Sequence, residues 1–147
     1  MIYLLDTDTL IFMIRGLKSS NRHQASRERA QILVDRCRQT QARGDTLAVS
    51  AITVAELEFG ARQCDRPDDE LLAIHKALTP FDRVDFDAIR APARFGEVRH
   101  DLEAAGQPIG AMDLLIAAHA LSIQATLVTN NTAHFARVSG ISVENWC

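Results

Sequence analysis

Five short runs of β-prone apolar residues, separated by segments with a helical pattern, are the feature that most constrains the fold. The runs occupy residues 2–5, 46–50, 81–84, 125–129 and 141–143. The segments that we expect to be helical are 9–15, about 22–43, 52–64, 67–78, most of 85–105, 112–122 and a short stretch up to 138. Short strands that alternate with helices are typical of a parallel sheet covered on both faces. The sequence therefore predicts an α/β fold, a three-layer α/β/α domain with a short parallel central sheet of four or five strands.

Residues with special backbone preferences predict several helix boundaries. Three residues that commonly cap helices precede the second helix: Ser19, Ser20 and Asn21. Gly44 is expected to end that helix, since glycine readily adopts the backbone conformation found just after helix ends. Pro92 lacks a backbone N–H donor, so we expect it to kink or divide the segment 85–105 near Arg90.

Length and composition favour a single domain over residues 1–147. With 147 residues, 47% of them hydrophobic, the chain is able to bury a substantial core. No apolar run approaches the ~20 residues that a membrane-spanning helix needs, and no basic region with a cleavage site begins the sequence. We therefore expect a cytoplasmic protein without a membrane partner. The three cysteines form no CxxC pair, which argues against a disulfide framework or a zinc site.

The net charge of −3 is unevenly distributed along the chain. Residues 15–43 contain eight Lys or Arg and two Asp or Glu, a balance of 8 − 2 = +6, so the remainder carries −3 − 6 = −9. Five arginines in this segment recur every seven residues: Arg15, Arg22, Arg29, Arg36 and Arg43. On one helix they would form a single, slowly drifting stripe. A solvated flank of the helix explains this stripe as well as contacts to phosphates do.

Three acidic residues are predicted to lie where strands or helices terminate. Asp6 directly follows the run 2–5, and Glu56 and Asp113 each lie in the first turn of a predicted helix. Any one of them is equally well explained as a partner of a helix dipole. Three that converge from distant segments are harder to explain in that way, because clustered carboxylates repel one another unless a cation neutralises them. Hard oxygen ligands without histidine or thiolate favour Mg²⁺, with Mn²⁺ as the other candidate.

Several common site motifs are missing from the sequence. It contains no GxGxxG, GxxxxGK[ST], GxSxG or HExxH segment, so dinucleotide, P-loop, serine-hydrolase and zincin chemistry lack their defining residues. His119 and His134 have no histidine partner four residues further on, and we interpret both as core-edge or surface residues.

Four segments together resemble the PIN-domain ribonucleases, and more narrowly the VapC-type toxins of bacterial toxin–antitoxin pairs. They are LLDTDTLI, SAITVAELEFGA, GQPIGAMDLLIAAHA and TLVTNNTAHFARVSGISVENW, which occur in that order over nearly the whole chain. The resemblance implies a PIN-like fold and a Mg²⁺-dependent endoribonuclease that cleaves RNA, often transfer RNA, and so inhibits translation. Three arginines of the stripe are then candidate RNA contacts: Arg22, Arg29 and Arg36.

The resemblance assigns the catalytic and metal-binding acids to Asp6, Glu56 and Asp113. The fourth acidic position of the family falls on Asn131 in this sequence. Its amide oxygen is still able to bind a metal ion or a metal-bound water, but a neutral amide makes the site less negative than a carboxylate would. At the position of Asp8 the family often carries asparagine, and we favour Asp8 as the cap of the first helix over an outer ligand. Two further residues at strand ends are supporting candidates that would hydrogen-bond a carboxylate or a metal-bound water: Thr7 and Thr129.

The resemblance to toxins also implies protein partners. A VapB-type antitoxin is expected to lay an amphipathic segment on apolar surface near Ile11, Phe12 and Ile14 and to direct a basic side chain toward the acids. Ordinary core packing is expected for at least one of these three residues. Family members commonly form homodimers, for which the C-terminal ISVENW segment and the helix 52–64 are candidates.

Two alternative functions compete with the nuclease. The segment DTDT matches the DxDx[TV] start of haloacid-dehalogenase-type phosphatases, but the chain has two lysines and carries Asn130 and Asn131 where a late acidic pair would hold the cation. The other alternative is a catalytically impaired PIN-like module that binds RNA or protein. Asn131 favours that module, whereas the three intact acids favour an active nuclease.

Overall fold

The structure is a computed structural model that describes residues 1–18 and 20–147. In these residues five parallel strands form one sheet, in the order β3-β2-β1-β4-β5. The strands are β1 (Ile2–Leu5), β2 (Thr46–Ser50), β3 (Asp82–Val84), β4 (Thr126–Val128) and β5 (Ser142–Glu144). The predicted α/β fold with a short parallel sheet is confirmed, and β1 is its central strand.

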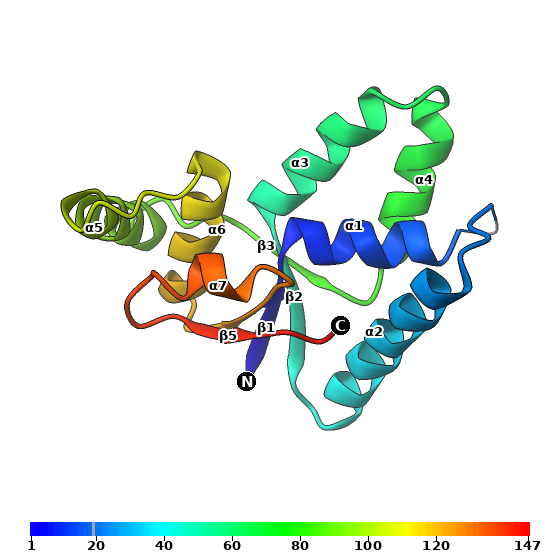
Figure 1. Ribbon diagram of the computed structural model, residues 1–147, viewed down its shortest axis with the longest axis horizontal. Helices are drawn as coiled ribbons and strands as arrows, with labels where there is room; N and C mark the ends of the chain where they lie inside the picture. Colours follow the sequence, from blue (N-terminus) through cyan, green and yellow to red (C-terminus); the bar gives the residue numbers. More distant parts are fainter. Residues whose placement is uncertain (19) are drawn as a thin grey trace.

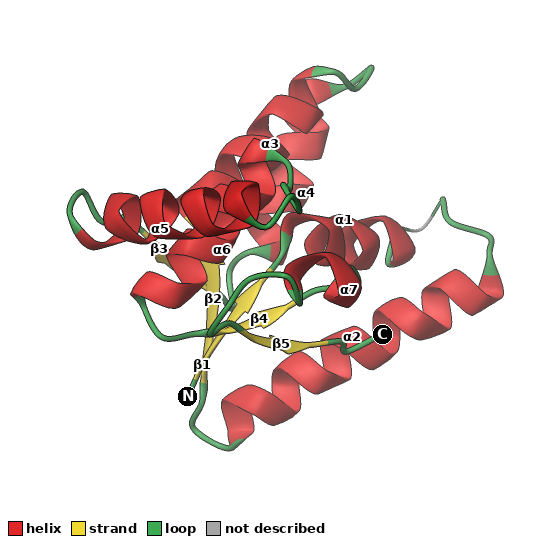
Figure 2. Cartoon of the chain, turned by 60° about the vertical axis from the view of Figure 1, so that its left-hand side comes forward, coloured by secondary structure: helices red, strands yellow, loops and turns green. Residues whose placement is uncertain are grey.

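Helices connect the strands and cover both faces of the sheet. In the described residues they are α1 (Thr7–Gly16), α2 (Gln24–Ala42), α3 (Ala51–Arg62), α4 (Pro67–Ala77), α5 (Arg90–Ala104), α6 (Ala111–Ser122) and α7 (Thr132–Phe135). Figure 1 shows α5, α6 and α7 on one side of the strands and α1 and α2 on the other. Helices α3 and α4 form a hairpin that extends beyond the sheet. Figure 2 shows the same layers after a 60° turn.

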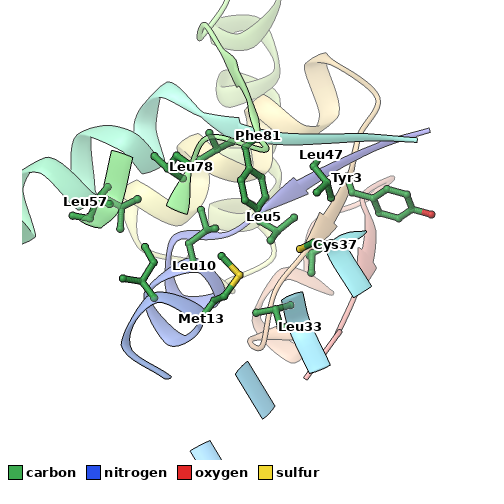
Figure 3. Close-up of a cluster of buried hydrophobic side chains, with 14 of the residues drawn as sticks. Tyr3, Leu5, Leu10, Met13, Leu33, Cys37, Leu47, Leu57, Leu78 and Phe81 are labelled. Atoms are coloured by element: carbon green, nitrogen blue, oxygen red, sulfur yellow. The ribbon is translucent and has the colours of Figure 1, made fainter. Parts of the chain in front are cut away.

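Alternating side chains of β1 enter two separate hydrophobic cores, as expected for a strand buried on both faces. Tyr3 and Leu5 pack with residues of α1, α2 and α3, and Figure 3 shows this core with Leu10, Met13 and Leu33 converging on Leu5. Leu4, which points the other way, belongs to the core formed with α5 and α6. The two cores fix the sheet between its helical layers.

All strands run in the same direction, so their carboxyl ends lie at one edge of the sheet. Leu5 pairs with Val128, and on the other side of β1 the strand β2 ends at Ser50. The residues that follow these strands, including Asp6 and Thr129, therefore emerge next to one another. This edge is where ligands of open α/β sheets usually bind.

No helix within residues 1–18 and 20–147 has both the length and the apolar character needed to cross a membrane.

The entry into α2 differs from the prediction based on capping residues. The N-cap of α2 is His23, and no side-chain hydrogen bond is made at that cap. Asn21 instead donates from Nδ2 to the carbonyl oxygen of Gly16, which ends α1, and accepts the N–H of His23 at Oδ1. Ser20 precedes this turn, and Ser19 lies outside the described residues.

The prediction that most of the segment 85–105 is helical is confirmed, with the helix beginning at Arg90 and residues 85–89 preceding it. Asp87 Oδ1 accepts the backbone N–H groups of Ile89 and Arg90 and starts the helix there. Pro92 consequently falls in the first turn of α5, where a missing N–H costs little, and it does not interrupt a helix.

Candidate active site

Asp6 is a buried carboxylate at the junction of β1 and α1. It is the N-cap of α1, and its Oδ1 accepts the N–H of Thr7 at 2.7 Å. Its Oδ2 accepts a hydrogen bond from the hydroxyl of Thr129 at 2.8 Å. The residue is 4% exposed. The expectation that Asp8 caps this helix was wrong, because Asp8 is the second residue of α1 and Asp6 is its N-cap.

The electrostatic surroundings of Asp6 favour its neutral form. Burial, the largest cause, raises its pKa to about 6. The hydrogen bonds from Thr129 and Thr7 lower the pKa, and the negative charges of Asp8 and Asp113 raise it further. Asp6, Asp8 and Asp113 are therefore close enough to repel one another, and a bound cation would relieve that repulsion.

Asp113 lies in the first turn of α6, and its side chain is 37% exposed. Burial raises its pKa, a nearby His134 lowers it, and the charge of Asp8 raises it. Asp8 itself is exposed at the start of α1. The structure thus brings together acids from α6 and from the β1–α1 junction, as the sequence predicted for Asp6 and Asp113.

Glu56, on α3, joins this group of acids through Thr7. The hydroxyl of Thr7 lies 2.7 Å from Glu56 Oε1 and 3.0 Å from the hydroxyl of Thr53. Since a carboxylate only accepts, Thr7 donates to Glu56. The backbone N–H of the same residue donates to Asp6, so Thr7 places the two carboxylates relative to each other.

A buried polar pair fixes the start of α3. Ser50 caps this helix by accepting the N–H of Ile52, and its Oγ lies 2.6 Å from Nδ1 of His119 on α6. Both residues are fully buried. Burial lowers the pKa of His119, so its imidazole is neutral and able to accept the serine proton at Nδ1. This contact joins the helix of Glu56 to the helix of Asp113.

The donor chemistry of these side chains fits a hard divalent cation. The candidate ligands are carboxylate oxygens, which Mg²⁺ and Mn²⁺ prefer. Burial and, to a smaller extent, neighbouring negative charge raise the pKa values of Asp6 and Asp113. Among the described residues, no group of three or more His, Cys, Asp or Glu side chains is arranged closely enough to enclose an ion. The acids therefore lie near one another without forming a closed coordination shell.

Asn131, the fourth position implied by the resemblance, contributes through its backbone. Its side chain is exposed and does not cap α7. Its N–H donates to the hydroxyl oxygen of Thr129 at 3.0 Å, and Thr129 donates in turn to Asp6. Asn130 is also exposed. The structure thus connects Asn131 to Asp6 indirectly.

His134 is a residue of this site that the sequence analysis missed. Its Nε2 lies 3.2 Å from Oδ2 of Asp113. The sequence offered one weak signal, a polar ring three residues after Asn131 on the short helix that follows β4. That position was interpreted as core-edge or surface because no second histidine lies at helical spacing.

The predicted arginine stripe is divided in the structure. Arg22 lies before α2, whereas Arg29 and Arg36 are exposed on it. Arg36 lies 5.5 Å above the ring of Trp146 and 4.0 Å from a carboxylate oxygen of Glu144. Arg36 is thus engaged by the C-terminal segment.

Cys147 interacts with both Arg29 and Asn130, and Asn130 lies in the loop between β4 and α7 beside the acids. Burial raises the pKa of the Cys147 thiol, while a hydrogen bond with Asn130 and the charge of Arg29 lower it. Arg29 therefore lies within electrostatic reach of a residue that borders the β4–α7 loop.

Comparison with known proteins identifies the family. A family model of the PIN domain matches residues 3–141. The chain is 35% identical over 146 residues to Ribonuclease VapC2 of Rickettsia felis, covering 99% of this chain and 98% of that protein. It is 32% identical over 145 residues to the tRNA(fMet)-specific endonuclease VapC of Salmonella typhimurium, with coverage of 99% and 98%.

Solved structures show the same fold over the full chain. VapBC2 from Rickettsia felis, bound to a DNA fragment from its promoter, matches with a TM-score of 0.81 and 33% identity, covering 100% of both chains. DNA-bound VapBC from Salmonella typhimurium matches with a TM-score of 0.83 and 31% identity, covering 100% of this chain and 99% of that one.

The chain belongs to the PIN-domain family. The ribonuclease and endonuclease relatives compared above are VapC proteins matched over nearly their full length, and this chain is a PIN-domain ribonuclease of that type. Nucleases with a PIN domain generally depend on a divalent metal ion.

Proposed function

We propose that this ribonuclease is the toxin of a toxin–antitoxin pair and that it hydrolyses phosphodiester bonds of transfer RNA with Mg²⁺ as its cofactor. The observation that carries this proposal is the convergence of acids from three distant segments at the carboxyl edge of the sheet. Burying Asp6 near the charges of Asp8 and Asp113 costs stability, as its raised pKa indicates. A protein that binds no cation would gain nothing from placing these carboxylates close together.

In this proposal Asp6, Glu56 and Asp113 hold the cation, and Mn²⁺ is able to replace Mg²⁺. Thr129 and Thr7 keep the carboxylates of Asp6 and Glu56 oriented, because each donates a hydroxyl proton to one of them. When bound, Mg²⁺ supplies positive charge that stabilises the developing charge on the phosphoryl oxygens and makes the attacking water more acidic. The exposed Asp8 adds negative charge and so strengthens cation binding.

Transfer RNA is the proposed substrate because relatives from Salmonella typhimurium and Shigella flexneri are tRNA(fMet)-specific endonucleases. A structured RNA is recognised largely through its phosphates and its exposed loop bases. Arg22 and Arg29 are exposed and suit phosphate contacts, and the charge of Arg29 acts on Cys147, which also contacts Asn130 in the loop that borders the acids. Arg36 is the weaker candidate, since Trp146 and Glu144 already engage it. A substrate of this kind places the activity in the cytoplasm.

A VapB-type antitoxin is the proposed inhibitor, and a groove beside the acids supports this role. A cavity of about 70 Å³ lies between α1, α3 and α4. Its lining includes apolar residues from all three helices, together with Glu56: Ile11, Ile14, Leu57 and Ile74. An amphipathic segment laid in this groove would reach Glu56 with a basic side chain. Ile14 is buried, so Ile11 and Phe12 are the more accessible contacts.

A homodimer is also proposed, with α3 as the contact. Phe59 on α3 is 65% exposed, and aromatic side chains are enriched in the cores of protein interfaces. The other candidate, the ISVENW segment, is less suitable because Trp146 is 5% exposed and packs against Tyr3 with ring centroids 5.2 Å apart.

The decisive experiment compares cleavage of total bacterial RNA by the wild type, Asp6→Ala and Asp113→Asn, with cut ends mapped by sequencing. Asp101→Asn is the matched control, because this exposed aspartate pairs with its neighbour His100 on α5. We expect cleavage at one or a few sites in transfer RNA by the wild type and the control, lost in both site variants and on addition of EDTA.

Two results would contradict the proposal. Undiminished cleavage by Asp6→Ala would show that these acids are not the catalytic centre. Mg²⁺ binding without cleavage of any RNA would favour the impaired binding module instead.

A further inference from the structure

His134 is the side chain that faces Asp113 from the segment after β4. Its Nε2 lies 3.2 Å from Oδ2 of Asp113, and the side chains are 27% and 37% exposed. The Nε2 atom itself is buried, and within the described chain it has no hydrogen bond of good geometry. A buried ring nitrogen aimed at a carboxylate, at hydrogen-bond distance but imperfectly aligned, needs only a small rotation to donate.

The position of His134 is fixed by the helix that carries it. The backbone N–H of His134 donates to the carbonyl oxygen of Asn131, and the adjacent Phe135 is fully buried in the core beneath. The His134 ring meets the Phe135 ring edge-on, with centroids 5.9 Å apart. The imidazole is therefore held against α6 by a helix that is anchored in the protein interior.

Asn131 has no comparable relation to the acids. Its side chain is exposed and leaves the α7 cap unfilled. Asp113 has one described partner from α7, and that partner is His134. The contact to Asp113 from α7 thus comes from a residue three positions further along the chain than Asn131, the position to which the resemblance assigns the fourth acid.

We propose that His134 is a positioning residue of the acid site, whose Nε2–H holds Oδ2 of Asp113 and leaves Oδ1 free for the cation. This inference rests on the proposed function. An aspartate on the first turn of a helix is otherwise free to rotate away from other carboxylates, and the charge of Asp8 favours such rotation. A donor fixed on α7 opposes it. Groups that orient a metal-binding side chain in this way typically change metal affinity about 10- to 100-fold.

The test measures Mg²⁺ and Mn²⁺ binding to the purified chain without RNA, by calorimetry, for the wild type, His134→Ala and His134→Gln. His100→Ala is the matched control, because His100 is exposed on α5 and also lies beside an aspartate. We expect His134→Ala to weaken binding of both cations about tenfold or more. His134→Gln retains an N–H donor of similar reach and is expected to recover most of the affinity, and the control is expected to match the wild type.

Cleavage kinetics supply the second measurement. A lost positioning residue should lower kcat at saturating RNA and leave KM nearly unchanged, since His134 does not bind the substrate in this proposal. Thermal unfolding without metal should change little for His134→Ala, because the side chain is partly exposed.

Three outcomes would overturn the inference. Unchanged cation affinity in His134→Ala is the first, and a Gln variant as weak as the Ala variant is the second. A loss confined to Mn²⁺ is the third, because it would make His134 a direct ligand. If the wild type cleaves RNA and the variants behave like it, this inference alone fails. If the wild type neither binds Mg²⁺ nor cleaves RNA, the proposed function fails as well.

Discussion

The hydroxyl of Thr129 donates a hydrogen bond to Oδ2 of Asp6 at 2.8 Å and joins the ends of β4 and β1 across 123 positions of the sequence. The oxygen of this hydroxyl also accepts the N–H of Asn131, so three residues form a chain of donors that ends on the buried carboxylate. This hydrogen bond lowers the pKa of Asp6 against the larger effect of burial. It therefore favours the charged form that a cation needs.

Replacing Thr129 by valine should raise the pKa of Asp6 above its value of about 6. Valine has nearly the same shape as threonine but lacks the donor. Hydrogen bonds to charged groups contribute about 1.5–3 kcal/mol, which corresponds to a rise of roughly one to two pKa units. Carboxyl NMR titration of metal-free protein measures the change. Thr129→Ser keeps the hydroxyl and should titrate like the wild type, and an unchanged pKa in Thr129→Val would contradict the prediction.

Asp6→Asn should stabilise the metal-free protein at pH 7. The pKa of Asp6 is raised from 3.8 to about 6, so the folded state binds this proton more tightly than the unfolded state does. Stability consequently falls as the pH rises from about 3.8 to about 6, and the full penalty is present at pH 7. Asparagine removes the buried charge and is still able to cap α1. The expected gain is on the order of 1–3 kcal/mol.

Urea unfolding in EDTA at pH 7 and at pH 4 measures this gain, which should largely disappear at the lower pH. Asp101→Asn is the control, because Asp101 is exposed on α5 and is not among the charges that shift the pKa of Asp6. A variant Asp6→Asn that is less stable than the wild type at pH 7 would disprove the argument.

The sequence predicted the fold and the main acids because both depend on local patterns. The strand at residues 46–50 was predicted with the bounds that the structure shows, since its apolar run is bordered by a turn and by the cap residue Ser50. Asp6 and Asp113 were found because each lies where an apolar run meets a helix start. Such positions at the carboxyl edge of a parallel sheet are brought together by the topology alone.

The rest of the site depends on contacts between distant segments, which a local pattern does not reveal. His134 was missed because its importance comes from Asp113, 21 positions earlier, and the approach of α7 to α6 is set by packing of the core. Asp8 was favoured as the helix cap over an outer ligand, because it directly precedes the helix that the sequence predicted from residue 9. The backbone instead makes Asp6 the cap, since Asp6 has the extended conformation of a cap residue.

The buried contact between Ser50 and His119 should give a measurable coupling energy in a double-mutant cycle. His119→Leu leaves the serine hydroxyl buried without its acceptor, which costs about 1–3 kcal/mol, and Ser50→Ala also removes the cap of α3. The double variant should be less damaging than the two single changes added together, because the unpaired group is gone. Denaturant unfolding of all four proteins measures the coupling, and strictly additive changes would show that the contact contributes nothing.

The close approach of α1 and α2 makes Gly16 a position where even alanine should be destabilising. A Cβ at this position would overlap the Cβ of Ala30 and lie 3.2 Å from the carbonyl oxygen of Ser26, so the two helices would have to move apart. We expect Gly16→Ala to lower stability by about 1–3 kcal/mol.

Gly96, on the exposed face of α5, is the matched control. Apart from its own helix and sequence neighbours, no described atom lies within 4 Å of the point that a Cβ would occupy there, so Gly96→Ala should be stabilising by about 0.5–1 kcal/mol. Thermal unfolding of both variants measures these changes. If the two substitutions changed stability in the same direction, the close approach of α1 and α2 at Gly16 would not explain the result.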